Sequence, residues 1–302
     1  MKIGIVGLGL IGGSLGFDLR SQGHEIFGIS RREKTCQEAI AIGAVDRASP
    51  NFELLKTVEL VFVCTPLSVI VPTVEQLCCY LSSDAVLTDV GSAKQTIVNA
   101  CQSLWPNFVG GHPMAGRDTS GLAAAQPNLF AGTPYVLTPT ECTPVSALDK
   151  LTQVVQSLGV EIYQTTPEKH DRAVAWISHL PAIASASLIT ACMEEPDPAI
   201  RSLAQAFASS GFRDTSRVGG GNPQLGCLMA QYNQSELLRS LQRYQQTLDR
   251  LIAYIEQTDW DALGGTLQQT QKARPAFLQA LQANDGQSMF PNKQPVSSPS
   301  EN

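Results

Sequence analysis

Short runs of apolar, often β-branched residues alternate with amphipathic stretches along the first half of the chain. The apolar runs predict strands at residues 2–6, 25–29, 60–64, 85–90 and 135–138, and a further strand that begins at Phe108. The stretches between them predict helices at about 13–22, 31–42 and 69–81, and one that ends near Ala100. Such alternation is typical of the α/β class, with a doubly wound, mostly parallel sheet and helices on both faces.

The pattern changes after about Thr166, where helical periodicity replaces the strands. Helices are predicted at residues 168–192, 197–210 and 223–283, and Gly, Ser, Pro, Asn and Gln dominate the end of the chain. We therefore predict a sheet domain at 1–166, an all-helical domain at 167–283 and a disordered tail at 284–302. Long helices with Ala, Leu and Gln on successive turns need a partner surface, which predicts an intertwined homodimer.

A glycine-rich turn joins the first strand to the first helix. Gly7, Gly9 and Gly12 stand at the spacing of a dinucleotide-binding turn, and Leu10 and Ile11 lie between the last two. Gly7 allows the tight turn, Gly9 lets the backbone approach a diphosphate, and Gly12 allows close packing of helix on strand. The N–H groups and dipole of the helix N-terminus favour the diphosphate. We predict a Rossmann-type domain with these five residues at the cofactor; the alternative is a glycine-rich turn without a ligand.

The end of the second strand indicates which cofactor the chain binds. Ser30, Arg31 and Arg32 occupy the place where an NAD site has a carboxylate for the ribose hydroxyls, and no acid follows until Glu33. A hydroxyl and two guanidinium groups suit the 2′-phosphate of NADP. The alternative is a solvated basic start to the next helix. At the end of another strand, Cys64, Thr65 and Pro66 are expected to border the same crevice, beside the nicotinamide.

A single histidine lies in the run Gly110-Gly111-His112-Pro113-Met114-Ala115-Gly116. Pro113 biases His112 towards an extended backbone, and the glycines permit positive φ or close backbone approach, so we predict a rigid turn. Such constraint suits a general base that must meet one proton in one place. Ser92 follows a neighbouring strand and is expected beside it. The alternative is a histidine that serves only as a hydrogen-bond partner in a turn.

Charge and cysteine content limit the remaining function classes. The net charge of −6 offers no attraction to nucleic acid or to a membrane surface, and no uninterrupted apolar run approaches the length of a membrane span. The predicted strand at residue 2 leaves no room for a signal peptide. The eight cysteines lack CxxC pairs and metal-ligand spacing. We expect reduced thiols, no metal and a cytoplasmic location.

Two segments of the helical half carry polar groups that suit a substrate. His179 precedes Leu180-Pro181, which predicts a perturbed helix at that point; a satisfied core histidine and a substrate contact are both open. Arg213, Asp214 and Arg217 fall within one short segment, where Asp214 and Arg217 are spaced for contact on a helical turn. Arg217 could then bind a substrate carboxylate, whereas the alternative is a surface ion-pair cluster.

Together these motifs resemble those of the prephenate and arogenate dehydrogenases. They occur in the family's order, over roughly residues 1–280, as GLGLIGG, Thr65-Pro66, DVGSAK, GGHPMAG, Ser178-His179-Leu180-Pro181 and GFRDTSR. The resemblance implies a dehydrogenase that oxidises a cyclohexadienol at its hydroxyl carbon while a carboxylate leaves as CO2. The products are tyrosine from arogenate and hydroxyphenylpyruvate from prephenate.

The resemblance also implies roles for individual residues. His112 would accept the substrate hydroxyl proton, and Ser92 would hydrogen-bond that hydroxyl or orient the imidazole. Arg217 matches an arginine that binds a substrate carboxylate. Asp118 matches an often acidic position near the mouth of the site, and His179 matches the first histidine of a segment that frequently reads HLPH.

The chain departs from the family pattern at two places. Ala182 replaces the second histidine of the HLPH segment, and Gly226-Cys227 stand in the region of a common tryptophan. Loss of an imidazole should harm prephenate more than arogenate, so we expect an NADP-dependent arogenate dehydrogenase. Prephenate dehydrogenase remains an alternative, as does a non-catalytic NADPH sensor. A 3-hydroxyacid dehydrogenase is a more distant alternative, because such enzymes use a lysine of the helical domain and no lysine here has that local context; Lys169 is the nearest.

Overall fold

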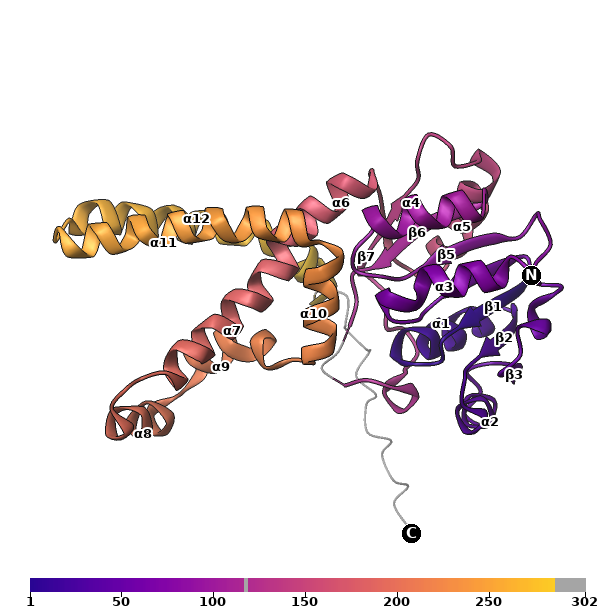
Figure 1. Ribbon diagram of the computed structural model, residues 1–302, viewed down its shortest axis with the longest axis horizontal. Helices are drawn as coiled ribbons and strands as arrows, with labels where there is room; N and C mark the ends of the chain where they lie inside the picture. The colour runs from indigo at the N-terminus through magenta and orange to yellow at the C-terminus, as the bar shows by residue number, and fades with distance from the viewer. Residues whose placement is uncertain (117–118, 286–302) are drawn as a thin grey trace, which may run out of the picture. The chain divides into compact units, whose positions relative to one another are not determined.

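The computed structural model describes residues 1–116 and 119–285 (Figure 1). The chain divides into two compact units, Met1–Ala253 and Tyr254–Asn302. The first unit contains the sheet and most of the helices, and with them nearly all the residues singled out above. Asp118 lies outside the described residues, as do residues 286–302 of the predicted tail.

The described part of the first unit contains one eight-stranded sheet with the order β3-β2-β1-β4-β5-β6-β7-β8. Its strands are β1 Lys2–Val6, β2 Glu25–Ile29, β3 Arg47–Ser49, β4 Leu60–Val63, β5 Val86–Asp89, β6 Phe108–Pro113, β7 Pro134–Thr138 and β8 Glu161–Gln164. Neighbouring strands are parallel except for β6 and β7. The strand order reverses between β1 and β4, which is where doubly wound sheets bind their ligands, outside the carboxyl ends of the strands. The predicted α/β class and mostly parallel sheet are confirmed.

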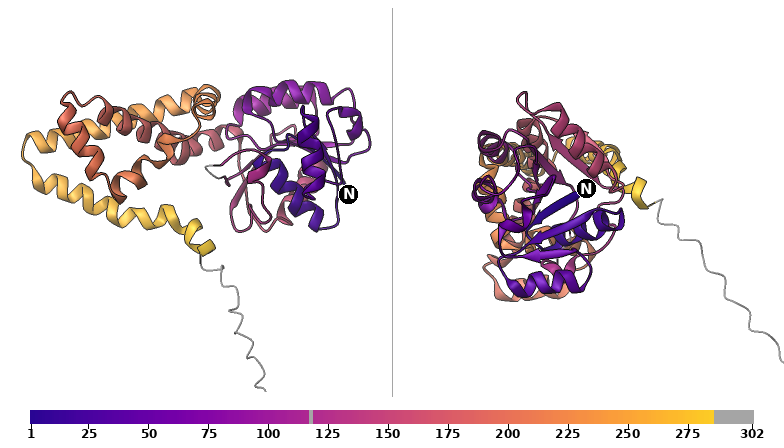
Figure 2. Two further views of the ribbon diagram at one scale, coloured as in Figure 1. Left: turned by 90° about the horizontal axis from the view of Figure 1, so that it is seen from below. Right: turned by 90° about the vertical axis from the view of Figure 1, so that its right-hand side faces the viewer.

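Each face of the sheet is buried by its own set of helices (Figure 2). Helices α1 (Leu10–Ser21) and α5 (Val145–Gln156) contribute to one apolar cluster, and α3 (Leu67–Leu77) and α4 (Gln95–Leu104) to the other. Side chains of one strand alternate between the two clusters, as Ile5 and Val6 do, because successive residues of a strand point to opposite faces. Burial on both faces explains why the strands read as nearly continuous apolar runs.

Several element boundaries differ from the predicted ones. Helix α1 begins at Leu10, directly after Gly9, and α2 spans Glu33–Ala41. Strands β3 and β8 and helix α5 were not predicted, because β3 and β8 are short and partly polar. Two short 3-10 turns, η1 Phe52–Leu55 and η2 Leu122–Ala124, complete the sheet domain.

The predicted rigid turn around His112 is wrong, because His112 lies within strand β6 and pairs with Val136 of β7. The adjacent glycines serve close packing, and neither has a positive φ. A Cβ on Gly110 would come within 2.3 Å of Thr138 Oγ1, and one on Gly111 within 2.8 Å of the Asp89 carbonyl oxygen. A side chain at either position would push β6 away from its neighbours.

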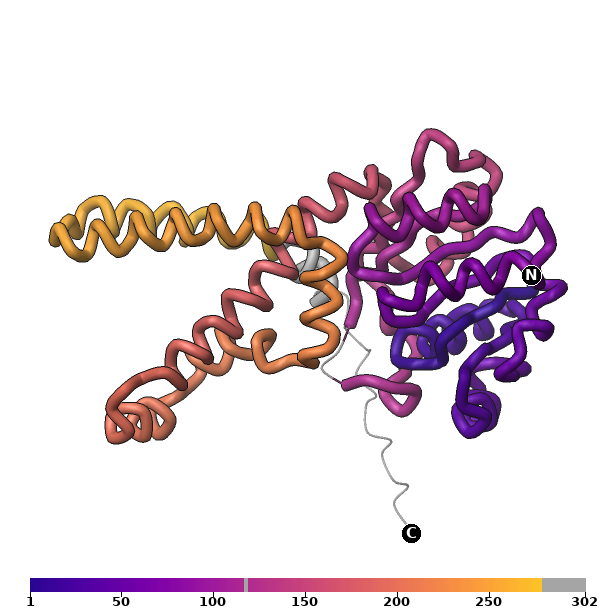
Figure 3. Tube along the Cα trace, viewed as in Figure 1, coloured from indigo at the N-terminus to yellow at the C-terminus, as the bar shows by residue number. Residues whose placement is uncertain are grey.

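The chain beyond β8 is helical, as predicted. Within the first unit it forms α6 Pro167–Val174, a π-turn η3 Ala175–His179, α7 Leu180–Met193, α8 Pro198–Phe207, α9 Ser210–Ser216, η4 Arg217–Gly220 and α10 Pro223–Tyr232. The chain runs out along α7, turns at α8 and returns through α9 and η4, which pack against α7 (Figure 3). The predicted perturbation at His179 is the π-turn, a local widening that is frequent at functional sites.

The single predicted helix at 223–283 is three helices. After α10 come α11 Gln234–Glu256 and α12 Trp260–Asp285. Asn233 ends α10, and Thr258 adopts a positive φ of 52° between the last two helices. Helix α12 belongs to the second unit and continues two residues beyond the predicted end at 283.

One continuous helical run, Pro167–Met193, is long and apolar enough by length and composition to cross a membrane. It contains buried His170, Asp171 and His179, whose polar atoms bond to groups on α4, β6 and the end of α10. Buried ionisable groups with protein partners are what a helix in a protein interior requires.

Candidate active site

The glycine turn after β1 has the geometry of a diphosphate cradle. Gly7 has a φ of 102°, and a Cβ there would lie 2.5 Å from the Cys64 carbonyl oxygen. A Cβ on Gly12 would lie 2.0 Å from the Gly7 carbonyl oxygen, whereas one on Gly9 would enter open space. Gly9 precedes α1 and offers no side-chain cap, so the first N–H groups of the helix, beginning at Leu10 and Ile11, remain for an anion. The turn fits a dinucleotide.

Two further strand ends border this turn, because β1 lies between β2 and β4. Ser30, Arg31 and Arg32 follow β2, and both arginines are exposed directly before α2. Cys64, Thr65 and Pro66 follow β4, where Thr65 Oγ1 is buried without a hydrogen-bond partner in the described part of the chain. An orphaned buried hydroxyl at this place suits a polar group of a bound ligand.

A buried ion pair fixes the carboxyl ends of β5 and β6. The Lys94 ammonium, fully buried, bonds the Asp89 carboxylate and donates to the Gly111 carbonyl oxygen at 2.7 Å. Asp89 also accepts from the backbone N–H groups of Gly91 at 2.8 Å and Gly111 at 3.2 Å. Both backbone polar groups of Gly111 are therefore held, and the adjacent His112 is placed with them. Ser92, half-buried, lies in the same short connection between Asp89 and Lys94.

His112 is the first member of a hydrogen-bonded chain. Its Nδ1 lies 2.8 Å from His170 Nε2, and His170 Nδ1 lies 2.8 Å from Asp171 Oδ1. A carboxylate only accepts, so His170 donates through Nδ1 and its Nε2 carries the lone pair. His112 must then donate through Nδ1, which leaves the lone pair on its Nε2. The network fixes the tautomer that a proton acceptor needs.

The surroundings keep both imidazoles neutral. Burial lowers the pKa of His112 well below 6.5, and the nearby His170 and Lys94 lower it further. Burial also lowers the pKa of His170, although its bond to Asp171 opposes this. At neutral pH His112 is therefore an unprotonated base in a buried position.

Asp171 connects this chain to three other groups. Its carboxylate accepts from the backbone N–H groups of Lys94 at 2.7 Å and Gln95 at 2.8 Å, at the N-terminus of α4. Its carbonyl oxygen accepts from Asn233 Nδ2 at 2.8 Å. The same Asn233 amide lies 3.1 Å from His179 Nδ1.

His179 presents an unsatisfied buried donor. Since Asn233 donates to its Nδ1, the proton of neutral His179 is on Nε2, which is buried and has no partner among the described residues. Burial lowers the pKa of His179 to about 4. A neutral N–H donor without a partner favours the ligand-contact interpretation over that of a satisfied core histidine.

The arginine segment lies on α9 and η4. Arg213 pairs with Asp214 at 2.9 Å, and both side chains are largely exposed. Arg217 opens η4 and is also exposed. The contact of Asp214 with Arg217 that the spacing predicts stays a prediction, as does the role of Asp118.

Sequence reasoning missed three residues of this network: His170, Asp171 and Asn233. His170 could have been found because histidine is rare in this chain, which has only four. It lies directly beside an acid, at the start of the helical half. No local pattern marked Asn233, which acts through long-range hydrogen bonds. Lys94 was noted only as part of a motif, without a role.

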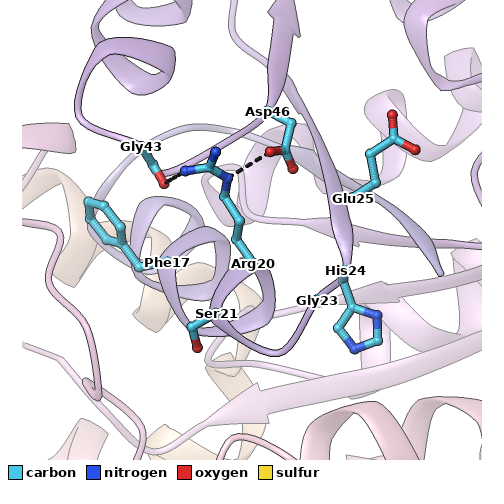
Figure 4. A pocket seen from close by; sticks show the side chains of 8 residues that line it. All are labelled: Phe17, Arg20, Ser21, Gly23, His24, Glu25, Gly43 and Asp46. Carbon is cyan, nitrogen blue, oxygen red and sulfur yellow. Dashed lines mark hydrogen bonds and ion pairs between the residues drawn. The ribbon is translucent and has the colours of Figure 1, made fainter.

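A cavity of about 540 Å3 opens elsewhere, at the amino ends of β2 and β3 (Figure 4). In it Arg20 donates to Asp46 at 2.7 Å and to the Gly43 carbonyl oxygen at 3.0 Å, so its charge is already satisfied. Ligands of doubly wound sheets bind at the opposite ends of the strands. Over residues 1–116 and 119–285, moreover, no cluster of three His, Cys, Asp or Glu side chains could hold a metal.

Comparison with known proteins identifies the family of the chain. Residues 15–164 match the model of the prephenate dehydrogenase nucleotide-binding domain, and residues 166–269 that of the prephenate dehydrogenase dimerization domain. Prephenate dehydrogenase of Bacillus subtilis is 32% identical over 266 residues, which cover 86% of this chain and 71% of the relative.

Two crystal structures are also similar. Synechocystis arogenate dehydrogenase is 53% identical, with a TM-score of 0.84 over 92% of this chain and 100% of that one. Prephenate dehydrogenase from Aquifex aeolicus, in complex with hydroxyphenyl propionate and NAD+, is 25% identical, with a TM-score of 0.87 over 92% and 98% of the two chains.

The glycine turn offers a matched pair of substitutions. Gly12→Ala places a Cβ against backbone, so we expect a loss of about 1–3 kcal/mol in the free energy of unfolding. Gly9→Ala enters open space, so its stability should stay within about 0.5 kcal/mol of the wild type. Gly9→Ala should nevertheless weaken dinucleotide binding about tenfold, because the Cβ occupies the room of the diphosphate. Denaturant unfolding and fluorescence titration measure the two effects. Equal affinity in Gly9→Ala and the wild type would contradict the cradle.

Proposed function

Because this chain belongs to the prephenate and arogenate dehydrogenase family, we propose that it converts L-arogenate to L-tyrosine and CO2 with NADP as hydride acceptor. Oxidoreductase activity of the prephenate/arogenate type and a nicotinamide cofactor follow from that membership. The choice of arogenate and of NADP is the proposal. The observation that carries the proposed dehydrogenase chemistry is the hydrogen-bonded chain from His112 through His170 to Asp171, at the sheet edge that also bears the glycine turn.

The site can carry out the proton transfers that this reaction requires. His112 Nε2 takes the proton of the substrate hydroxyl as the carbon–hydrogen electron pair leaves that carbon. The nicotinamide, when bound, supplies the acceptor for this hydride. The bond to the carboxylate then breaks, CO2 leaves, and its electron pair makes the ring aromatic. The resulting phenolate takes a proton back from His112, so the reaction neither consumes nor releases a net proton.

Two neutral groups support His112 in this role. His170 holds the imidazole in the tautomer whose Nε2 accepts a proton, and the bond to Asp171 fixes the orientation of His170 in turn. Ser92, from the adjacent strand end, is proposed to hydrogen-bond the substrate hydroxyl. Lys94 stays on Asp89 and Gly111 and serves as a fixed positive charge that keeps His112 neutral between turnovers.

Substrate carboxylates would be bound by the arginine segment. Arg217 is the proposed partner, because a guanidinium binds a carboxylate bidentately, and Arg213 and Asp118 are proposed to border the entrance. His179 Nε2, the orphaned donor, is proposed to contact the substrate from the interior side. The departing carboxyl should not be held tightly, because it leaves as a neutral molecule.

We propose arogenate as the substrate because Ala182 replaces a histidine of the family pattern. Ala182 stands three residues after His179 and offers no polar contact to the keto group of prephenate. The 53% identity to Synechocystis arogenate dehydrogenase supports the same choice. NADP is preferred because Ser30, Arg31 and Arg32 offer a hydroxyl and two cations where NAD sites have a carboxylate.

The proposal includes a homodimer in the cytoplasm. A groove of about 450 Å3 lies between α7, α10 and α11 and is lined by Ile183, Ala230, Gln231, Gln234, Leu237, Leu238 and Leu241. Leu238 is 50% exposed there, and Phe207 on α8 is 75% exposed. Apolar surface of this kind in a domain that matches a dimerization model suits a second copy of the chain.

Initial rates with arogenate and prephenate, each combined with NADP and NAD, test the proposed function. We expect kcat/KM for arogenate with NADP to exceed the other three combinations by about 100-fold, because missing polar partners discriminate strongly. Reduced-nicotinamide absorbance measures the rates. Turnover only with prephenate would overturn the substrate choice. Turnover that does not change in His112→Ala would overturn the site.

Two variants serve as the cofactor arm of that experiment. Arg31→Ala should raise KM for NADP about tenfold and leave KM for NAD unchanged, since it removes one charge-assisted contact to a phosphate. Lys34→Ala is the control, because Lys34 is an exposed cation of α2 that pairs with Glu38 at 3.7 Å. If Arg31→Ala and Lys34→Ala raise KM for NADP equally, Arg31 contributes only general positive charge and no direct contact to the phosphate.

His170→Ala tests the proton chain. We expect kcat to fall about 100-fold, because the tautomer of His112 is no longer fixed. Since His170 and burial both lower the pKa of His112, removing His170 should raise that pKa. The wild-type rate should hold as pH falls through 6.5 and drop only as His112 is protonated, whereas the acid limb of the variant should lie at higher pH.

His170→Gln is the matched control, because its amide oxygen can still accept from His112 Nδ1. It should recover part of kcat. An acid limb at the same pH in His170→Ala and the wild type would contradict the role assigned to His170.

Leu238→Arg tests the dimer. A charge in the apolar groove should shift the protein towards monomer at micromolar concentration, because an unpaired charge would be buried in the interface. Sedimentation velocity measures the change. Val145→Arg, an exposed apolar position on α5 of the sheet domain, is the control and should leave the mass unchanged. A monomeric wild type would refute the dimer.

A further inference from the structure

Ser185 of α7 binds the backbone on both sides of Arg217. Its hydroxyl donates to the Thr215 carbonyl oxygen at 2.8 Å and accepts from the Gly219 N–H at 2.8 Å. The two bonded residues lie two positions before and two positions after Arg217. Ser185 is only 4% exposed, so these bonds are largely shielded from water. One buried hydroxyl thus spans the turn from which the arginine projects.

The turn also packs closely against α7 at Gly219. A Cβ on Gly219 would lie 2.4 Å from the Ala186 nitrogen and 2.5 Å from the Ser185 carbonyl carbon. Only glycine allows η4 to lie this close to α7, and the closeness brings the Gly219 N–H within reach of the hydroxyl. Figures 1 and 3 show α9 and η4 returning along α7.

The side chains of this turn do not anchor it in the core. None of the residues of α9 or η4 is buried, so no apolar side chain from Ser210 to Gly220 enters the core. The backbone at Arg217 is therefore held by its close packing on α7 and by the two hydrogen bonds of Ser185.

We propose that Ser185 is a positioning residue that aims Arg217 at the substrate carboxylate. The inference rests on the proposed function, since it assigns a support to the substrate contact named there. A guanidinium binds a carboxylate bidentately only when its backbone is held in place, because each lost alignment weakens both bonds. The hydroxyl acts through backbone atoms and touches no reacting atom.

The test is steady-state kinetics of Ser185→Ala with arogenate and NADP. Loss of both hydrogen bonds should raise KM for arogenate about tenfold, with kcat within about twofold and KM for NADP unchanged. Ser187→Ala is the matched control: Ser187 is an exposed serine of the same helix whose hydroxyl bonds only within α7, to Ile183, at 2.8 Å. It should match the wild type.

A double-mutant cycle separates positioning from general loosening. In an Arg217→Ala background, Ser185→Ala should have almost no further effect on KM, because the hydroxyl acts through the arginine. Gly219→Ala, which displaces η4 by a different route, should reproduce the rise in KM and covers the case in which Ser185→Ala folds poorly. Thermal unfolding of each variant shows whether it is folded.

The outcomes separate this inference from the proposed function. If the wild type turns over arogenate but KM is unchanged in both Ser185→Ala and Gly219→Ala, only the positioning role is overturned. The same follows if Ser185→Ala raises KM equally with and without Arg217. If the wild type turns over neither arogenate nor prephenate, the proposed function fails and the positioning role fails with it.

Discussion

The buried carboxylate of Asp171 is the constraint on which the rest of the site depends. One of its oxygens accepts from the Lys94 N–H and from His170, and the other accepts from the Gln95 N–H. A negative charge at the N-terminus of α4 is favoured by the helix dipole, which offsets part of the cost of its burial. The carboxylate that joins α6 to α4 is therefore the same group that orients the imidazole chain. The packing of α6 on α4 and the orientation of the His170 and His112 rings therefore depend on the same carboxylate.

A second buried charge completes this arrangement. Lys94 neutralises Asp89, and both bond the backbone of Gly111, the residue before His112. The ammonium also lowers the pKa of His112, because a second positive charge nearby is unfavourable, so the imidazole stays neutral. Buried ion pairs add little to stability, but removing one partner is costly. The pair fixes the backbone of Gly111, and with it the position of His112 at the carboxyl end of β6.

The sequence predicts those parts of the site whose residues act through local geometry. The glycine turn, the strand ends and His112 all follow from spacing within a few residues, and each lies where the alternating pattern places it. His170, Asp171 and Asn233 act across the fold: His112 and His170 are 58 residues apart, and Asn233 bonds Asp171 over 62 residues. Hydrophobic periodicity does not predict hydrogen bonds between residues so far apart in the sequence. The wrong turn at His112 has a related cause, since Gly110 and Gly111 are required by Thr138, Thr88 and Asp89 rather than by their own φ angles.

The π-turn at Ala175–His179 explains how one helical run can form hydrogen bonds in two different directions. An extra residue in a turn rotates all later side chains by about 100° relative to a regular helix. Before the turn, His170 and Asp171 bond towards β6 and α4; after it, Ser185 bonds towards η4. The histidine chain and the turn that bears Arg217 thus have separate supports on one continuous element, with His179 between them. A regular helix with the same sequence would place Ser185 about a quarter-turn away from η4, and its hydroxyl would no longer bond the backbone of Thr215 and Gly219.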